Sequence, residues 1–487
     1  MAPKPTDSGH ELHPLEHDVL SLASGNVSGA PQQAAEEVLM LPREAPPSDD
    51  TAPPAPSLNK IESLSASVNE CIRFVSKHVL GREEVIRQSF MALITGEHQL
   101  LISRTGMAKS LLARQIFACF EGAQIFEKQL TKDTMPENLF GAYDIEAMKK
   151  GKMIHNVEGS LVLSHFAFLD EIFDANDMLL RSLLSLLNEK QLVNGEQIVS
   201  STLHSAIGAA NYIRITEVLE AVIDRFLYKS YIPENKDLYF QYSIDHIYQN
   251  HFGKIVVPDT RITLGELTFL KNLVQSRQIE IPGYVLFLKN YILKKYIEET
   301  RNMVSDQQNF TISDRKSVKT QDTLRAAAVL AGRPTVEEQD LQYLMFAVCT
   351  LGRTEETARF AKILNAAKNY FRQDRNSLEN IFDAIGILLL IKGHPDRDAL
   401  KTDETFNLIR TRLETVARSG NSLFVEYVNK LRQKFKALTH DTYIPETFTV
   451  LENLSEVSLK EVRSREAREL VSGFRDEIYR TKQLLSI

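Results

Sequence analysis

The chain lacks the features of a secreted or disulfide-stabilised protein. Its 487 residues include only three cysteines, Cys71, Cys119 and Cys349, which are far apart and form no CxxC pair. This scarcity argues against a disulfide framework or a zinc site and is typical of a reducing compartment. No apolar run follows the first charged residues, so the sequence predicts no signal peptide. We therefore expect a cytoplasmic protein.

Long apolar runs and an excess of positive charge are also missing. The longest apolar stretch, residues 385–391, is interrupted by Gly386 and is far too short to cross a bilayer, so no membrane insertion is expected. The formal net charge is -7 at pH 7, and no basic stripe with interleaved aromatic residues occurs. A nucleic-acid partner is therefore not expected, and a DNA-acting motor has little support.

The composition of the chain predicts four segments. Residues 1–57 combine clustered prolines with serine, glycine and acidic residues, so they are expected to be a disordered tail. Residues 58–233 alternate apolar strand patterns with amphipathic helix patterns, which predicts a parallel sheet with helices on its faces. Residues 234–352 are predicted to form a helical lid, and residues 353–487 a helical accessory or adaptor domain.

Periodicity places several elements within the α/β segment. The expected strands cover residues 99–102, 123–129, 166–169 and 203–210. The expected helices cover residues 61–78, 85–94, 110–120 and 178–187. Functional sites of parallel α/β sheets lie beyond the carboxyl ends of the strands. Polar residues that follow these strands are therefore the candidates for function.

The segment after the first expected strand has the character of a phosphate-binding loop. A strict loop reads GxxxxGK[ST], and here Ser103 and Ala108 replace its two glycines. Gly106 still permits close approach of the backbone to phosphate. Lys109 supplies a charge for the β- and γ-phosphates, and the helix that starts at Ser110 directs its N–H groups at an anion. A surface turn capped by a hydroxyl is the simpler interpretation, but the buried strand before the loop and the amphipathic helix after it favour phosphate binding. The loop residues expected to bind nucleotide are Ser103, Arg104, Thr105, Gly106, Met107, Ala108, Lys109, Ser110 and Leu111.

Two adjacent carboxylates, Asp170 and Glu171, follow the strand expected at 166–169. Solvated acids are common at strand ends, but adjacent carboxylates at the mouth of a buried strand repel one another unless a cation is present. Mg²⁺ would supply that cation, held by Asp170 and the hydroxyl of Ser110, while Glu171 would orient the attacking water. The two motifs together predict a nucleoside triphosphatase that uses ATP and Mg²⁺.

These motifs resemble those of the MoxR family of AAA+ ATPases, most closely its RavA-like branch. The resemblance covers about residues 76–345 and is carried by several short segments: Lys109-Ser110, Asp170-Glu171-Ile172, Leu187-Asn188-Glu189-Lys190-Gln191, Asn194-Gly195, and 135–141, which is similar to the sequence before the family's helix-2 insert. It implies an α/β fold in which an AAA+ P-loop core with a parallel sheet precedes a helical lid and a C-terminal all-helical region. It also implies a homo-oligomeric ring, typically a hexamer, with a protein client and a von Willebrand factor A domain partner.

The resemblance also assigns roles to three polar residues. Asn211, after the strand expected at 203–210, matches the sensor that holds the γ-phosphate or the attacking water. Arg225 matches the arginine finger that reaches a neighbouring subunit's nucleotide, worth about 10³–10⁵ in rate in comparable enzymes. Arg315 matches a second sensor at the start of a lid helix. Their simpler explanations are an amide that caps a turn, an arginine paired with Asp224, and a charge at a helix start.

A third segment, Val79, Leu80 and Gly81, resembles the family's stretch beside the adenine ring, where a glycine lets the backbone approach the base. The resemblance as a whole implies ATP hydrolysis that drives chaperone-like remodelling of a protein client.

A nucleotide-binding scaffold with little or no turnover is the alternative function. The residues Ser103, Arg104 and Thr105, which depart from the family's loop, favour the scaffold. Glu171, Asn211 and Arg225 favour hydrolysis, because a protein that only binds nucleotide needs none of them.

Overall fold

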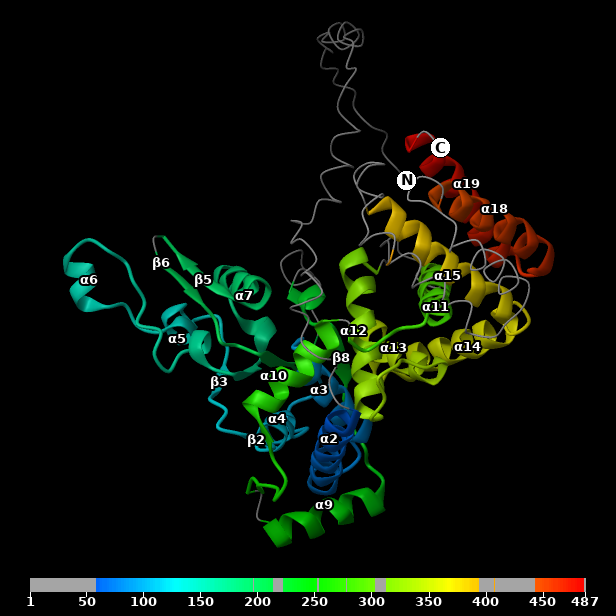
Figure 1. Cartoon of the computed structure of the whole chain (residues 1–487). Helices are drawn as coiled ribbons and strands as arrows, with labels where there is room; N and C mark the ends of the chain where they lie inside the picture. The colour runs from blue at the N-terminus through cyan, green and yellow to red at the C-terminus, as the bar shows by residue number, and fades with distance from the viewer. Residues whose placement is uncertain are drawn as a thin grey trace, which may run out of the picture. The chain divides into compact units, whose positions relative to one another are not determined.

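The computed structural model describes residues 58–195, 197–212, 222–251, 254–276, 278–302, 312–393, 407 and 443–485 (Figure 1). The expected disordered tail lies outside these residues, as does most of the predicted helical region between residues 394 and 442. Among the described residues, none of the helices combines the length and the apolar character that a membrane span needs.

A six-stranded sheet forms the centre of the α/β segment, and each of its neighbouring strand pairs is parallel. The strand order is β10-β8-β1-β7-β4-β3. The bounds are β1 Gln99–Ile102, β3 Ile125–Gln129, β4 Phe166–Asp170, β7 Ser205–Ala210, β8 Tyr228–Tyr231 and β10 Thr350–Leu351. This arrangement confirms the predicted parallel α/β class. It also places the carboxyl end of β1 beside that of β7, with β4 as the next strand.

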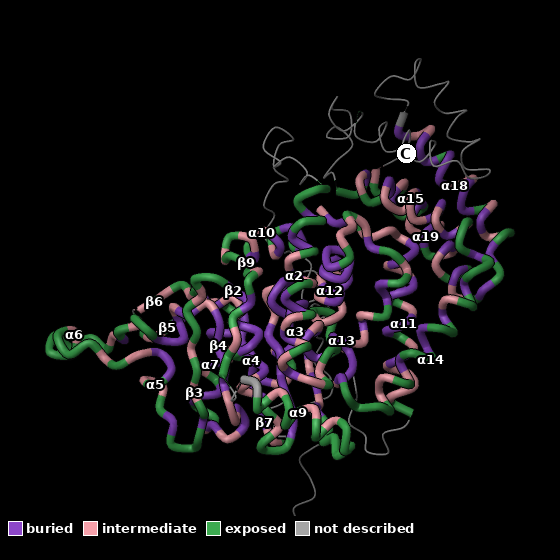
Figure 2. Tube along the Cα trace, turned by 90° about the horizontal axis from the view of Figure 1, so that it is seen from below, coloured by how far each residue is buried: buried purple, intermediate pink, exposed green. Residues whose placement is uncertain are grey.

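The central strands β1, β4 and β7 are buried on both faces, whereas the edge strand β3 is partly exposed. Successive side chains of a strand point to opposite sides, so each central strand contributes to two apolar layers. Leu101 belongs to one apolar cluster, whereas Leu100 and Ile102 belong to a second. The first cluster continues into the helices α2, α3, α4 and α10, and the second into α7. Figure 2 shows this buried interior running through the strands and the helices that cover them.

The helices follow the predicted order along the chain. Their bounds are α2 Leu58–His78, α3 Glu83–Thr95, α4 Lys109–Phe117, α5 Glu137–Phe140, α6 Ile145–Lys149, α7 Asp177–Glu189, α9 Leu238–His251, α10 Leu264–Gln275, α11 Gly283–Arg301, α12 Asp314–Leu330, α13 Leu344–Val348, α14 Thr354–Tyr370, α15 Arg375–Lys392, α18 Tyr443–Glu461 and α19 Arg465–Leu484. Short 3₁₀ helices cover Leu161–Leu163, Ile172–Asp174 and Glu338–Tyr343. The described residues after β8 are thus mostly helical, as expected, and α11 packs against both α14 and α15.

One helix ends earlier than its apolar pattern predicts. The helix expected over 110–120 stops at Phe117, and Phe120 lies in β2, Phe120–Glu121, which pairs with β9, Ile262–Thr263. Phe120 is buried in either conformation, so its apolar character could not distinguish a last helical turn from a strand. The strands expected from 123 and 203 begin at Ile125 and Ser205.

Several strands were not predicted, among them β8, the short β9 and the antiparallel hairpin of β5, Gln191–Asn194, with β6, Gln197–Ser200. The strand β10 was not predicted either; it pairs with β8 although residues 232–349 separate the two strands in sequence. Gly352, directly after β10, has φ +87°, and a Cβ there would lie 1.9 Å from the carbonyl oxygen of Tyr231. Only glycine fits this approach.

Candidate functional site

The phosphate-binding loop joins β1 to α4 and is tied to β7 at its start. The backbone N–H of Ser103 donates to the carbonyl oxygen of Ala210 at 3.1 Å, and the Ser103 hydroxyl donates to the carbonyl oxygen of Arg104. Ser103 is fully buried and is not among the described residues with positive φ. The serine therefore occupies the first glycine position of the motif without backbone strain.

The middle of the loop has the backbone conformation of an anion-binding turn. Gly106 has φ +84°, and no heavy atom lies within 4 Å of the position that a Cβ would take. Ala108 adopts the left-handed conformation, with φ 57° and ψ 32°, at the N-terminus of α4. Left-handed alanine is strained, and such strain is commonly retained at functional sites. The loop thus leaves open space beside the first N–H groups of α4, where a phosphate can bind.

Lys109 is buried at the centre of the site, with only 7% of its surface exposed. Its Nζ donates to the carbonyl oxygens of Ser103 at 3.1 Å and Ala210 at 3.3 Å, and to Asn211 Oδ1 at 2.7 Å. Burial lowers the pKa of Lys109, and the neighbouring carboxylates of Glu171 and Asp170 oppose that shift. The lysine is thus held by neutral oxygens close to two acids.

Asn211 connects the lysine to the carboxylate that follows β4. Its Nδ2 donates to Glu171 Oε1, while its Oδ1 accepts from Lys109. Glu171 has φ 51°, which turns the chain sharply after Asp170, and its N–H donates to Asp170 Oδ1 at 3.0 Å. Burial is the main cause that raises the pKa of Glu171, and Lys109 counteracts it. The structure therefore brings together Lys109, Asp170, Glu171 and Asn211.

The oxygen atoms near the loop are suitable ligands for Mg²⁺ that binds together with the substrate. Among the described residues, no cluster of three or more histidine, cysteine, aspartate or glutamate side chains could hold a metal by itself. Ser110, in the first turn of α4, and Asp170 offer the hard oxygen ligands that Mg²⁺ prefers. Mg²⁺ usually takes one or two protein oxygens and completes its shell with phosphate oxygens and water. The residues present fit a metal that arrives with a nucleoside triphosphate.

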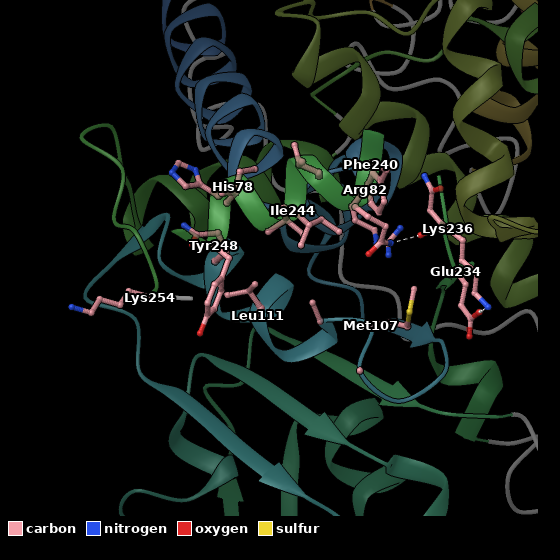
Figure 3. A pocket seen from close by; sticks show the side chains of 18 residues that line it. His78, Arg82, Met107, Leu111, Glu234, Lys236, Phe240, Ile244, Tyr248 and Lys254 are labelled. Atoms are coloured by element: carbon pink, nitrogen blue, oxygen red, sulfur yellow. Dashed lines mark hydrogen bonds and ion pairs between the residues drawn. The ribbon is translucent and has the colours of Figure 1, made fainter. Parts of the chain in front are cut away.

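A cavity of about 570 Å³ opens beside the loop (Figure 3). Val79, Leu80, Gly106, Met107, Ala108 and Leu111 line it, and all six are among the residues predicted to bind nucleotide. Gly81 has φ +64°, and a Cβ there would lie 2.8 Å from Phe240 Cε2. Glu234, Lys236 and Met107 lie at one end of the cavity, and His78, Tyr248 and Lys254 lie at the other (Figure 3).

One wall of this cavity was missed by sequence reasoning. Phe240, Ile244, Ile247 and Tyr248 of α9 line it, and Figure 3 shows Tyr248 pointing towards Leu111 of α4. The apolar residues of α9 recur at helical spacing, which was the available signal. No motif connected them with a nucleotide site.

The two predicted arginines lie together and apart from this cavity. Arg225 and Arg315 line a small second pocket with Lys316 and Lys319, and the described lining residues of the large cavity include neither arginine. Arg225 Nη1 forms an ion pair with Asp224 Oδ2 at 3.2 Å, and Arg315 Nη2 donates to Asn188 Oδ1 at 3.3 Å. The structure therefore groups the predicted residues into a loop-and-carboxylate site and a separate cationic pocket.

Two family models match the parts of the chain that carry these features. Residues 66–242 match the MoxR domain in the MoxR-vWA-beta-propeller ternary systems, and residues 291–363 match an AAA lid domain. The first match contains Lys109, Glu171, Asn211 and Arg225.

Known proteins resemble part of this chain. An uncharacterized protein of Methanocaldococcus jannaschii is 30% identical over 292 residues, which cover 59% of this chain and 69% of that protein. Chaperone MoxR1 of Mycobacterium tuberculosis is 22% identical over 292 residues, 58% of this chain and 74% of that protein. A crystal structure from Cytophaga hutchinsonii, described as that of a candidate ATPase, superposes with a TM-score of 0.50 at 17% identity, over 64% of this chain and 96% of that one. This last likeness supports the fold.

Proposed function

Because the chain belongs to the MoxR family of AAA+ ATPases, we propose that it hydrolyses ATP with Mg²⁺ in a homo-oligomeric ring and thereby remodels a protein client. The observation that carries the proposal is the separation of the two parts of the site. Lys109, Asn211 and Glu171 form one connected group, while Arg225 and Arg315 lie in another pocket. A second copy of the chain would bring its arginines to the first copy's nucleotide.

Within one subunit, the contacts of Lys109 suggest how the nucleotide engages the site. The β- and γ-phosphates would replace the carbonyl oxygens of Ser103 and Ala210 as partners of the ammonium group. The Asn211 amide would then be free to donate to the γ-phosphate or to orient water, and Glu171 would accept a proton from that water. Ser110 and Asp170 would hold Mg²⁺, which when bound neutralises charge on the phosphate oxygens.

The arginines would act between subunits. Arg225 and Arg315 line one pocket, so one neighbouring subunit can present both to the same nucleotide. A cation at the γ-phosphate stabilises the charge that develops in the transition state, by about 10³–10⁵ in rate for an arginine finger. An isolated subunit should therefore hydrolyse slowly.

The proposal also names a partner, a ring size, a cellular location and domain limits. The matched family model is described from systems that combine a MoxR protein, a von Willebrand factor A domain and a β-propeller, which supports a von Willebrand factor A domain partner here. The proposed ring is a hexamer in the cytoplasm. Assignment to the RavA-like branch rests on motif resemblance alone. The proposed domain limits are 58–233 for the core, 234–352 for the lid and 353–487 for the accessory domain.

The test is steady-state ATP hydrolysis across a series of protein concentrations. Specific activity should rise with concentration in the wild type and collapse in Glu171→Gln and Arg225→Ala. Arg114→Ala is the control, because Arg114 is another arginine paired with an acid, Glu127 at 2.7 Å, and lines neither pocket. Nucleotide binding without turnover in the wild type would instead support the scaffold.

Mixing the two inactive variants separates action between subunits from action within one. In a mixed ring, a Glu171→Gln subunit can supply its intact Arg225 to an Arg225→Ala subunit, whose Glu171 is intact. Activity should therefore return on mixing. If mixed samples stay as inactive as either variant alone, although they co-assemble, the shared-site mechanism is wrong.

A further inference from the structure

Helix α9 borders the nucleotide cavity without being packed into the protein. None of its residues from Leu238 to Gln249 is buried. Its inner side, with Phe240, Ile244 and Tyr248, faces the cavity (Figure 3). A surface helix normally has one apolar stripe, which packs on a core; in α9 that stripe faces a space that fits a nucleotide.

The opposite side of α9 is also apolar. Leu238, Tyr239 and Tyr242 are 85%, 81% and 70% exposed. At 100° per residue these three positions lie on one side of the helix, away from Phe240 and Ile244. We call Leu238, Tyr239 and Tyr242 the outer face of α9. Large side chains gathered in this way on a surface commonly form an interaction site.

The position of the outer face indicates which molecule binds it. Arg104 of the phosphate-binding loop forms an ion pair with Glu234 at 3.1 Å, so the segment that leads into α9 lies beside the loop. The outer face starts four residues later, at Leu238. A second copy that reaches the phosphates with Arg225 would therefore approach near this face.

The surface around the arginines offers a complementary patch. Val318 of α12 is 61% exposed and lies one helical turn after Arg315. Lys319 follows it, in the same pocket as Arg225 and Arg315, and is paired with Glu97 at 2.6 Å. Arg315 donates to the neutral Asn188 Oδ1 and is the cation next to Val318. On α9, Asp245 lies one turn after Tyr242, on the same side as the outer face. Apolar residues on both surfaces, with Asp245 on one and Arg315 on the other, suit a head-to-tail contact.

We propose that the outer face of α9 docks onto the start of α12 in a second copy of this chain, and that nucleotide bound under the inner side of α9 strengthens this contact. The inference rests on the proposed ring. The adenine base of a bound nucleotide would contact Phe240 and Tyr248. This contact would restrain α9, which makes few other contacts with the protein. Occupancy of one subunit's cavity is thereby communicated to its neighbour.

The test compares assembly of Tyr239→Ser/Tyr242→Ser with that of the wild type by sedimentation velocity, with Mg²⁺ and a non-hydrolysable ATP analogue. The variant should need at least about tenfold more protein to assemble. Tyr479→Ser is the control, because Tyr479 is 55% exposed on α19, far along the chain. The control should assemble as the wild type does. Binding of a fluorescent ADP to unassembled protein reports that the variants are folded and should stay within about twofold of wild type.

A cross-link gives a positive readout for the same contact. Leu238→Cys and Val318→Cys, combined in one chain, should form disulfide-linked oligomers on mild oxidation, more with nucleotide than without. If the wild type assembles but the tyrosine variant assembles equally well, the outer face belongs to another partner and the inference is overturned while the ring stands. If the wild type never assembles, both the ring and the docking contact are wrong.

Discussion

Replacing Asn211 tests the proposed chemistry with a change of very few atoms. Asn211 accepts from Lys109 at 2.7 Å and donates to Glu171, so its amide connects the cation to the proposed catalytic base. Removing one hydrogen bond to a charged group costs about 1.5–3 kcal/mol, which predicts that Asn211→Ala slows hydrolysis by about 10- to 150-fold.

Asn211→Asp has nearly the same shape but adds a carboxylate in contact with Glu171. Two like charges about 4 Å apart repel by about 4 kcal/mol at an effective dielectric of about 20, and Lys109 offsets part of this. The loss of the donor and the added charge act in the same direction. We therefore expect Asn211→Asp to be at least about tenfold slower than Asn211→Ala.

Single-turnover hydrolysis at saturating ATP separates this effect from binding. Thermal melting and ATP affinity show whether either variant is misfolded. The predicted order of rate is wild type, then alanine, then aspartate. An aspartate variant as fast as the alanine variant would mean that the amide does not act as a donor in the reaction.

Three further results are expected. Ala108→Gly removes the strain of an alanine in the left-handed conformation, although glycine gives the unfolded chain more conformational entropy. The first effect is the larger, so urea denaturation should show a free energy of unfolding higher by about 0.5–1 kcal/mol. Burial raises the pKa of Glu171, and Glu171 must be ionised to act as a base. The acid limb of the kcat/KM–pH profile should therefore lie above the ordinary glutamate value of 4.5, and activity that stays level down to that pH would contradict this. Gly352→Ala places a Cβ against the Tyr231 carbonyl oxygen at positive φ, so it should lower stability by about 3 kcal/mol or more, seen as a large fall in Tm; an unchanged Tm would show that the strand end adjusts freely.

The sequence was sufficient for the parts of the fold that local patterns determine. The buried runs of β1, β4 and β7 were recognisable because strands covered on both faces read as continuous apolar stretches. The two-residue strand β10 was not recognisable, because its only reason to be extended is its partner β8, which is distant in sequence.

One part of the candidate site could likewise be predicted from the sequence, and another part could not. Lys109, Asp170 and Asn211 could be predicted to meet, because each lies at or beyond the carboxyl end of a strand and parallel strands end at one edge of the sheet. The shared pocket of Arg225 and Arg315 could not be predicted, since it depends on where a lid helix packs. The contribution of α9 to the cavity depends likewise on tertiary packing rather than on local pattern.

The strand β10 also has a consequence for how the chain is made. During synthesis, β8 emerges long before Thr350 and Leu351, because residues 232–349 lie between them. Until β10 arrives, the backbone groups along one edge of β8 lack their partner, and an unpaired strand edge can recruit other chains. The nascent core is thus exposed to aggregation until β10 has emerged from the ribosome. A protein truncated before residue 350 should keep every residue of the phosphate site and still be poorly soluble, because it retains that open edge.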